Sequence, residues 1–187
     1  MTFRVLVVCT GNICRSPMAE HLLRAGLAAR GVEGVEVSSA GTHGLVGEPV
    51  QQHASAVLTE RGIDHSAFAA RRLDADLVAG ADLVLGASRE HRAAAVTLVP
   101  RAAGRTFTIR ELDRLLARVD PAELPTDPGE RAPALVVAAA RQRGMAHPER
   151  PEDDDVADPY GGPAAGYAPT ARLLDASLQR FLDILGG

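Results

Sequence analysis

Residues Val8–Pro17 read VCTGNICRSP and form a short loop between an apolar run and a predicted helix. Cys9 and Arg15 stand at the two ends of this loop, with five residues between them. Gly11 and Asn12, inside the loop, adopt positive φ at low cost, so the chain can curl and turn successive backbone N–H groups inward. Together with the N-terminus of the following helix, such a loop makes a cradle for a tetrahedral anion.

The composition bounds the class of protein. With 187 residues, 46% of them hydrophobic, we expect a single domain over residues 1–187 with a sizeable core. The net charge of −4 argues against a general nucleic-acid binder, which needs a basic face.

The apolar run at residues 5–9 is too short for a membrane span or a signal peptide, so we expect no membrane partner and a cytoplasmic location. The two cysteines fit neither a disulfide framework nor a structural zinc site, and we expect no metal or other cofactor.

Aliphatic and β-branched runs alternate with helical apolar patterns along the chain. Strands are expected at residues 3–8, 35–42, 81–88 and 105–109, and helices at about 17–31, 51–61, 89–96, 110–119 and 168–185. A further helix-like patch, PALVVAAARQRG, lies at residues 133–144. This order predicts an α/β fold: a doubly wound, mostly four-stranded parallel sheet with helices on both faces. The phosphate-binding loop would follow the first strand, at the carboxyl edge where such sheets bind ligands.

The residue types in the loop predict its chemistry. Cys9 would stand at the end of the first strand, where the helix dipole and the inward N–H groups lower a thiol pKa and supply a thiolate nucleophile. Arg15 adds a planar charged fork for two phosphate oxygens, and the Ser16 hydroxyl can donate to the sulfur. A buried structural cysteine is the alternative for Cys9 alone, but the joint pattern favours the anion loop. The loop lacks the Gly-Lys-[Ser/Thr] ending of a nucleotide-binding loop.

Several motifs together resemble the low-molecular-weight protein tyrosine phosphatase family in its bacterial form. The signature is VCTGNICRSPMAE at residues 8–20, and the further similarities are SSAGT at 38–42, ARRL at 70–73, ADLVLGAS at 81–88 and DPYGG at 158–162. The resemblance covers about residues 3–119 and 157–185. It implies a metal-independent phosphomonoester hydrolase that works through a cysteinyl-phosphate.

The resemblance also assigns roles to the matching residues. Cys9 would attack phosphorus, and Asp158 would protonate the leaving oxygen and then act as base on the hydrolytic water. The equatorial oxygens would be stabilised by the Arg15 guanidinium and by the loop amides, those of Thr10, Gly11, Asn12, Ile13, Cys14 and Arg15. Asn12 would take a left-handed conformation, held by a hydrogen bond with Ser39.

Asp158 is one of three aspartates in the sequence that precede a proline, and distance from Cys9 along the chain excludes none of them as the general acid. The others are Asp120 and Asp127, and an arbitrary Asp-Pro is usually a turn. Only Asp158 is followed by Tyr-Gly-Gly and a C-terminal helix, as the family pattern requires. The acidic run at residues 152–155 suggests a divalent metal, but such runs are usually solvated and the mechanism needs no metal.

The expected partner is a phosphorylated protein, with phosphate or a similar oxyanion in the loop. Ile13, Leu45 and Tyr160 would form the substrate wall. Leu45 stands where many tyrosine-specific members have an aromatic residue, which weakens stacking on a phenol ring. A branch of the family that removes phosphate from arginine carries threonine in place of Ile13. The bulk of Ile13 should narrow the pocket against a guanidinium, so we favour phosphotyrosine, with protein-arginine phosphatase as the alternative.

Three features stay open at the level of sequence. The family commonly has a histidine that orients the loop asparagine, but that position holds Phe68 here and His65 lies three residues too early. The support of Asn12 is therefore either rebuilt or less rigid. Cys14 is either a redox partner that traps oxidised Cys9 as a disulfide or an apolar filler. Residues 120–156 look like a segment inserted within the domain. This segment shapes substrate choice, binds a partner, or is a surface insertion without a function of its own.

Two other functions remain as alternatives. Arsenate reductases built on the same fold use a similar loop, and the thioredoxin-coupled kind needs two further cysteines downstream. This chain has none after Cys14, so only a reductase that uses an external thiol is compatible. A phospho-ligand binding module without catalysis is the second alternative, although the presence of Cys9, Arg15 and Asp158 argues against it.

Overall fold

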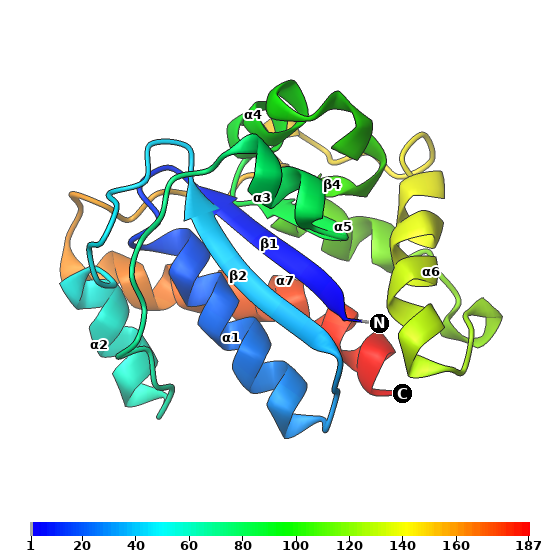
Figure 1. The fold of residues 1–187 in the computed structure, drawn as a ribbon, viewed down its shortest axis with the longest axis horizontal. Coiled ribbons are helices and arrows are strands. Elements are labelled where there is room, and N and C mark those ends of the chain that lie inside the picture. Colours follow the sequence, from blue (N-terminus) through cyan, green and yellow to red (C-terminus); the bar gives the residue numbers. More distant parts are fainter. Residues whose placement is uncertain (1) are drawn as a thin grey trace.

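A computed structural model describes residues 2–187 and shows a four-stranded parallel sheet in the order β2-β1-β3-β4 (Figure 1). The strands are β1 (Phe3–Cys9), β2 (Val35–Gly41), β3 (Leu83–Gly86) and β4 (Thr106–Thr108). The α-helices are α1 (Arg15–Ala29), α2 (Gln52–Glu60), α3 (Ala75–Gly80), α4 (Arg89–Leu98), α5 (Ile109–Leu116), α6 (Pro128–Arg141) and α7 (Tyr167–Gly186). Short 3₁₀ helices are η1 (Pro100–Arg105), η2 (Pro121–Glu123), η3 (Pro151–Asp154) and η4 (Ala164–Gly166). The predicted α/β fold with a parallel sheet is confirmed.

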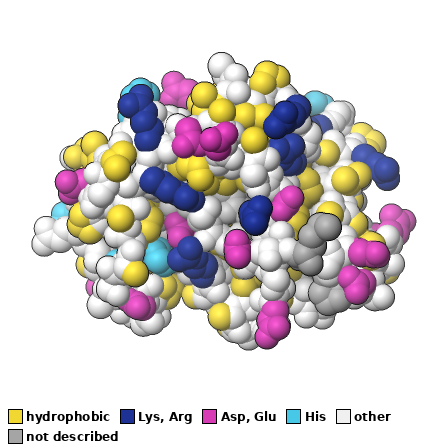
Figure 2. Space-filling view, viewed as in Figure 1, with side chains coloured by type: hydrophobic (Ala, Val, Ile, Leu, Met, Phe, Trp, Pro, Cys, Tyr) yellow, Lys and Arg dark blue, Asp and Glu magenta, His cyan; other side chains and the backbone are white. Residues whose placement is uncertain are grey.

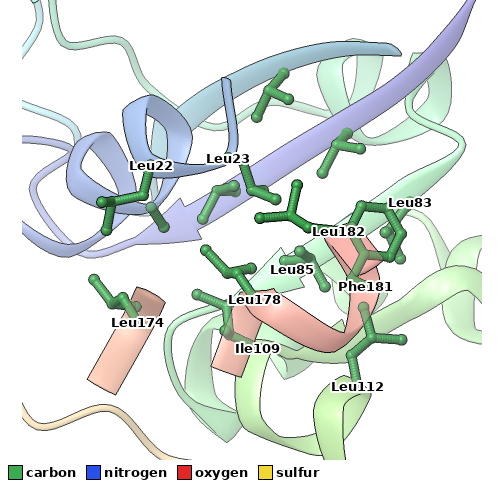
Figure 3. Close-up of a cluster of buried hydrophobic side chains, with 14 of the residues drawn as sticks. Leu22, Leu23, Leu83, Leu85, Ile109, Leu112, Leu174, Leu178, Phe181 and Leu182 are labelled. Atoms are coloured by element: carbon green, nitrogen blue, oxygen red, sulfur yellow. The ribbon is translucent and has the colours of Figure 1, made fainter. Parts of the chain in front are cut away.

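Strand β1 lies inside the sheet and is buried on both faces, because its side chains alternate between two apolar clusters. Val5 and Val7 belong to the larger cluster, which also contains residues of α1, α5 and α7. Leu6 and Val8 belong to a smaller cluster with residues of α3 and α4. Figure 3 shows side chains of α1, α5, α7 and β3 converging in the larger cluster. Burial on both faces explains the continuous apolar run of this strand.

The carboxyl end of β1 is the point where the sheet can hold a ligand. Strand β1 pairs in parallel with β2 on one side and with β3 on the other. The strand order therefore reverses at β1, and ligands bind at such a switch point. Cys9 is the last residue of β1 and is in register with Gly41 at the end of β2.

Two helices differ from the sequence expectation. Helix α3 was not predicted; the side chain of Asp74 caps it by accepting a hydrogen bond from the backbone of Leu77 at 2.8 Å. Helix α6 begins at Pro128, five residues before the patch that the sequence indicated. The Asp127 side chain caps its first turn, and the helix continues through Pro133. A cap that accepts backbone N–H groups starts a helix even where prolines weaken the pattern.

The proline-rich segment at residues 120–156 packs on the larger cluster. Helix α6 contributes buried Leu135, Val136 and Ala139. Beyond its end, the Arg143 guanidinium lies 4.0 Å from the ring centroid of Phe107, on the edge strand β4. A cation over an aromatic face is attractive, so this contact fixes the segment to the sheet edge.

The surface in Figure 2 carries mixed charge. Basic and acidic side chains are interspersed over this face rather than gathered by sign. Among the described residues, no helix combines the length and the apolar character needed to cross a membrane.

Candidate active site

The loop between β1 and α1 has its carbonyl oxygens turned outward. Those of residues 9–11 accept hydrogen bonds from the backbone of residues 42–45 at 2.9 to 3.0 Å, and that of Ile13 accepts one from Gln51 at 2.8 Å. Within the described chain, the N–H groups of residues 10–15 donate no hydrogen bond to a protein acceptor. Because peptide carbonyls and N–H groups point in opposite directions, the donors are left for an anion inside the curl.

Gly41 allows the close approach on which this arrangement rests. A Cβ built at Gly41 would press against the carbonyl oxygen of Thr10 and lie 2.9 Å from the backbone nitrogen of Asn12. Real Cβ atoms almost never lie that close to a backbone atom. Any side chain at this position would therefore push the loop out of place.

Asn12 shapes the loop with its backbone and its side chain. Its φ is 55°, a left-handed conformation that Asn tolerates. Its Nδ2 donates to Ser39 Oγ at 2.7 Å and to Ser16 Oγ at 2.9 Å, and its Oδ1 accepts from the backbone N–H of Arg71 at 2.8 Å. Ser39 in turn donates to Glu20 at 2.5 Å. The fully buried amide is thus satisfied on both sides.

The missing family histidine does not leave Asn12 without support. Phe68 packs edge-on against the ring of His21, with the ring centroids 5.8 Å apart. His65 hydrogen-bonds to Ser55 at 2.6 Å. Neither Phe68 nor His65 hydrogen-bonds to Asn12 in the described chain, so of the two alternatives left open by the sequence, the structure shows the rebuilt support.

Cys9 and Ser16 are both buried, with Sγ and Oγ 2.9 Å apart. Since Ser16 Oγ already accepts from Asn12, its own hydroxyl proton is available to the sulfur. A hydrogen bond to a thiolate stabilises the charged form. The geometry therefore allows Ser16 to support Cys9 as a thiolate.

Arg15, at the start of α1, is buried and faces Asp158. Its Nη2 lies 2.5 Å from Asp158 Oδ2 and 3.3 Å from Thr10 Oγ1, and its Nη1 donates to the carbonyl of Val156 at 3.1 Å. Its buried Nε has no protein partner among the described residues. The Asp158 carboxylate is 43% exposed, and its Oδ1 accepts from the backbone N–H of Tyr160. The structure thus brings the loop at residues 9–15 and the DPYGG loop together.

Two histidines that sequence reasoning missed lie at the site. His43 lines the cavity over the loop. His91 is buried; its Nε2 is 3.0 Å from Thr10 Oγ1 and its Nδ1 is 2.7 Å from Ser88 Oγ. Burial and the nearby Arg15 charge lower the pKa of His91 to about 4, so its ring is neutral at neutral pH. Its position near the start of a helix after the third strand was the only sequence signal.

A cavity of about 280 Å³ opens over the loop. The three residues expected to form the substrate wall, Ile13, Leu45 and Tyr160, all line it. Leu45 and Tyr160 are exposed, whereas Ile13 is buried. Asp158 also borders the cavity, so one apolar space joins the loop to a carboxylate.

Cys14 lies under the loop as a buried free thiol. Burial, with a smaller effect from Cys9, raises the pKa of Cys14 to about 12. The thiolate is the reactive form, so Cys14 is a weak nucleophile at neutral pH. A raised pKa favours Cys14 as an apolar filler under the loop. The alternative, a disulfide between Cys14 and oxidised Cys9, stays a prediction.

The acidic run at residues 152–155 was expected to be solvated, but most of it is paired. Arginines hold three of its carboxylates, in the pairs Asp153–Arg150, Asp154–Arg114 and Asp155–Arg89, at 2.7 to 2.9 Å. Within residues 2–187, no group of three or more His, Cys, Asp or Glu side chains is placed to hold a metal.

Known proteins resemble this chain in sequence and in fold. The family model for low molecular weight phosphotyrosine protein phosphatase matches residues 4–128. The chain belongs to that family. It is 43% identical over 103 residues to the low molecular weight protein-tyrosine-phosphatase Etp of Escherichia coli K12, a match over 55% of this chain and 66% of that protein, just under two thirds of its length.

Two other relatives match nearly the whole chain. A protein-arginine-phosphatase of Geobacillus stearothermophilus is 30% identical over 185 residues, which is 99% of this chain and 97% of that protein. The crystal structure of a low molecular weight protein tyrosine phosphatase from T. tengcongensis has a TM-score of 0.71 and 32% identity, over 97% of this chain and 99% of that one. The family thus includes relatives named for two different phosphorylated residues.

Gly41→Ala should weaken anion binding, because the added methyl group displaces the loop backbone. We expect inorganic phosphate to bind about tenfold less tightly, measured by isothermal titration calorimetry. Gly80→Ala is the matched control, since a Cβ there meets nothing within 4 Å. Wild-type phosphate affinity in Gly41→Ala would show that the close approach is unimportant.

His91 should make stability fall in acid. Its pKa is about 4 in the folded protein against the usual 6.5, so the unfolded chain binds more protons between these values. Its contribution, roughly 3 kcal/mol, is fully present above about pH 6.5 and is lost as the pH falls through about 4. Urea unfolding from pH 7 to 4 should show a shallower loss for His91→Gln than for the wild type. Identical slopes, or a His91 ring that titrates near 6.5 by NMR, would contradict this account.

Proposed function

We propose that this chain is a protein phosphatase that hydrolyses phosphomonoesters through a cysteinyl-phosphate intermediate. One observation carries the proposal: Cys9 lines the same cavity as Arg15 and Asp158, in a loop whose N–H groups find no acceptor within residues 2–187. Family membership supports the same reaction class. A reducing, cytoplasmic location suits this chemistry, because the nucleophile must stay a thiol.

In the first step, the Cys9 thiolate attacks phosphorus and the phosphorus–oxygen bond to the leaving group breaks. The loop N–H groups and the Arg15 fork hold the equatorial oxygens, whose charge they stabilise without reorganisation. Asp158 acts as the general acid and gives a proton to the leaving oxygen. A phosphate oxygen competes with Asp158 for the Arg15 guanidinium, which frees the carboxyl group for this role.

In the second step, Asp158 takes a proton from water as that water attacks the cysteinyl-phosphate. The phosphorus–sulfur bond breaks and Cys9 leaves as a thiolate. Ser16, 2.9 Å from the sulfur, stabilises this leaving group by donating its hydroxyl proton. Inorganic phosphate is the second product.

Phosphotyrosine is the substrate that we favour. The cavity wall of Ile13, Leu45 and Tyr160 is apolar and suits a phenyl ring better than a charged guanidinium. A second candidate is phosphoarginine, which the near full-length similarity to a protein-arginine-phosphatase favours. In that case Asp158 would also face the guanidinium.

Initial rates on a phosphotyrosine peptide and on a phosphoarginine peptide of the same sequence distinguish the two substrates. We expect faster release from phosphotyrosine and none from either peptide with Cys9→Ser. Ile13→Thr should shift the ratio towards phosphoarginine, because the wall becomes smaller and more polar. Faster release from phosphoarginine in the wild type would overturn the substrate assignment.

Absence of any Cys9-dependent release would overturn the enzyme assignment on these substrates. Arsenite production from arsenate with an external thiol would then identify a reductase. Phosphopeptide binding without turnover would identify a binding module.

A further inference from the structure

Asp155, in the acidic run just before the Asp158 loop, contacts the start of helix α4. Asp155 Oδ1 accepts a hydrogen bond from the backbone N–H of Arg89 at 2.8 Å, at the start of α4. Its Oδ2 also accepts from Arg89 Nη2 at 2.9 Å. Ser88 occupies the N-cap position but makes no cap bond, because its hydroxyl is engaged by His91. Asp155 therefore caps α4 from a segment 66 residues away.

The backbone next to Asp155 is fixed as well. The Val156 N–H donates to the carbonyl of Ala87 at 2.8 Å, and the Val156 carbonyl accepts from Arg15 Nη1 at 3.1 Å. Arg110 donates to the carbonyl of Asp155 at 3.2 Å. Residues 155 and 156 are thus hydrogen-bonded to four places: the residue after β3, the start of α4, the start of α5, and Arg15.

Asp158 itself has little support of its own. Its side chain is 43% exposed and contacts Arg15 and the backbone of Tyr160. When a phosphate oxygen replaces Asp158 as the partner of Arg15, the position of the Asp158 carboxyl group depends on the segment that precedes it. That segment is anchored through the Asp155 side chain and the Val156 backbone, three and two residues before Asp158.

The Asp155–Arg89 contact is suited to an anchor. Burial acts to raise the pKa of Asp155, but the hydrogen bonds from Arg89 outweigh it, so the pKa lies below its usual value and the carboxylate stays charged. Hydrogen bonds to a charged acceptor are stronger than those to a neutral acceptor, and several donors fix its orientation. The neighbouring Asp153–Arg150 pair is local: the two residues are three apart in sequence, and the Asp153 carboxylate accepts from the Arg150 backbone and guanidinium.

We propose that Asp155, held by Arg89, is a positioning residue that places the Asp158 carboxyl group over the leaving oxygen. This role rests on the proposed phosphatase function. Asp155 does not touch the reacting atoms, and it acts through the three-residue link to Asp158.

The leaving group tests this role directly. A poor leaving group needs a proton from the acid, whereas nitrophenolate leaves with little help. We expect Asp155→Ala to lower kcat/KM about tenfold for phenyl phosphate and less than about twofold for 4-nitrophenyl phosphate. Arg89→Ala should show the same pattern with a smaller loss, because its backbone N–H still binds Asp155. Asp153→Asn, in the same acidic run, should leave both rates unchanged.

The double variant separates positioning from a general structural effect. If Asp155 acts through Asp158, Asp155→Ala combined with Asp158→Asn should be no slower on phenyl phosphate than Asp158→Asn alone. Equal losses on both substrates, no loss on either, or multiplied losses in the double variant would overturn the proposal. The proposed function fails separately, if Cys9→Ser retains activity or Asp158→Asn shows no leaving-group dependence.

Discussion

The backbone hydrogen bonds between the loop at residues 9–15 and residues 42–45 are the constraint on which the site depends. They turn the loop carbonyls outward, and the N–H groups of residues 10–15 are consequently left for an anion. The parallel register of β1 and β2 brings the two segments together, and Gly41 lets them touch. The left-handed Asn12 completes the curl through three hydrogen bonds. An oxyanion cradle built from fixed dipoles needs no reorganisation during a reaction.

The second half of the site comes from a distant part of the chain, and arginines connect the two halves. Arg15 donates both to Asp158 and to the carbonyl of Val156. Arg89 holds the preceding Asp155. The same guanidinium contacts Thr10 in the loop and Asp158 in the distant segment, so an anion that binds Arg15 would compete with the Asp158 carboxylate. The segment at residues 120–156 ends at these contacts, so its packing on the core bears on the position of Asp158.

The fold could be predicted from sequence because its strands are local apolar runs and its loop signature is contiguous. The predicted strand at residues 3–8 matches β1 to within one residue. Helix α3 was missed because a helix of six residues is too short to show an apolar period, although the adjacent Asp74 caps it. The contacts of His91 and Asp155 were also missed. Their partners lie 81 and 66 residues away in sequence, and only the crossover connections of the sheet bring them together.

Backbone amide NMR of Cys9→Ser during a titration with inorganic phosphate tests the central claim most directly. The account predicts saturable shifts for the amides of residues 10–15, which donate no hydrogen bond within the described chain. The amides of His43 and Leu45, already bonded to loop carbonyls, should shift far less. Phosphate binding that leaves the amides of residues 10–15 unmoved would contradict the account.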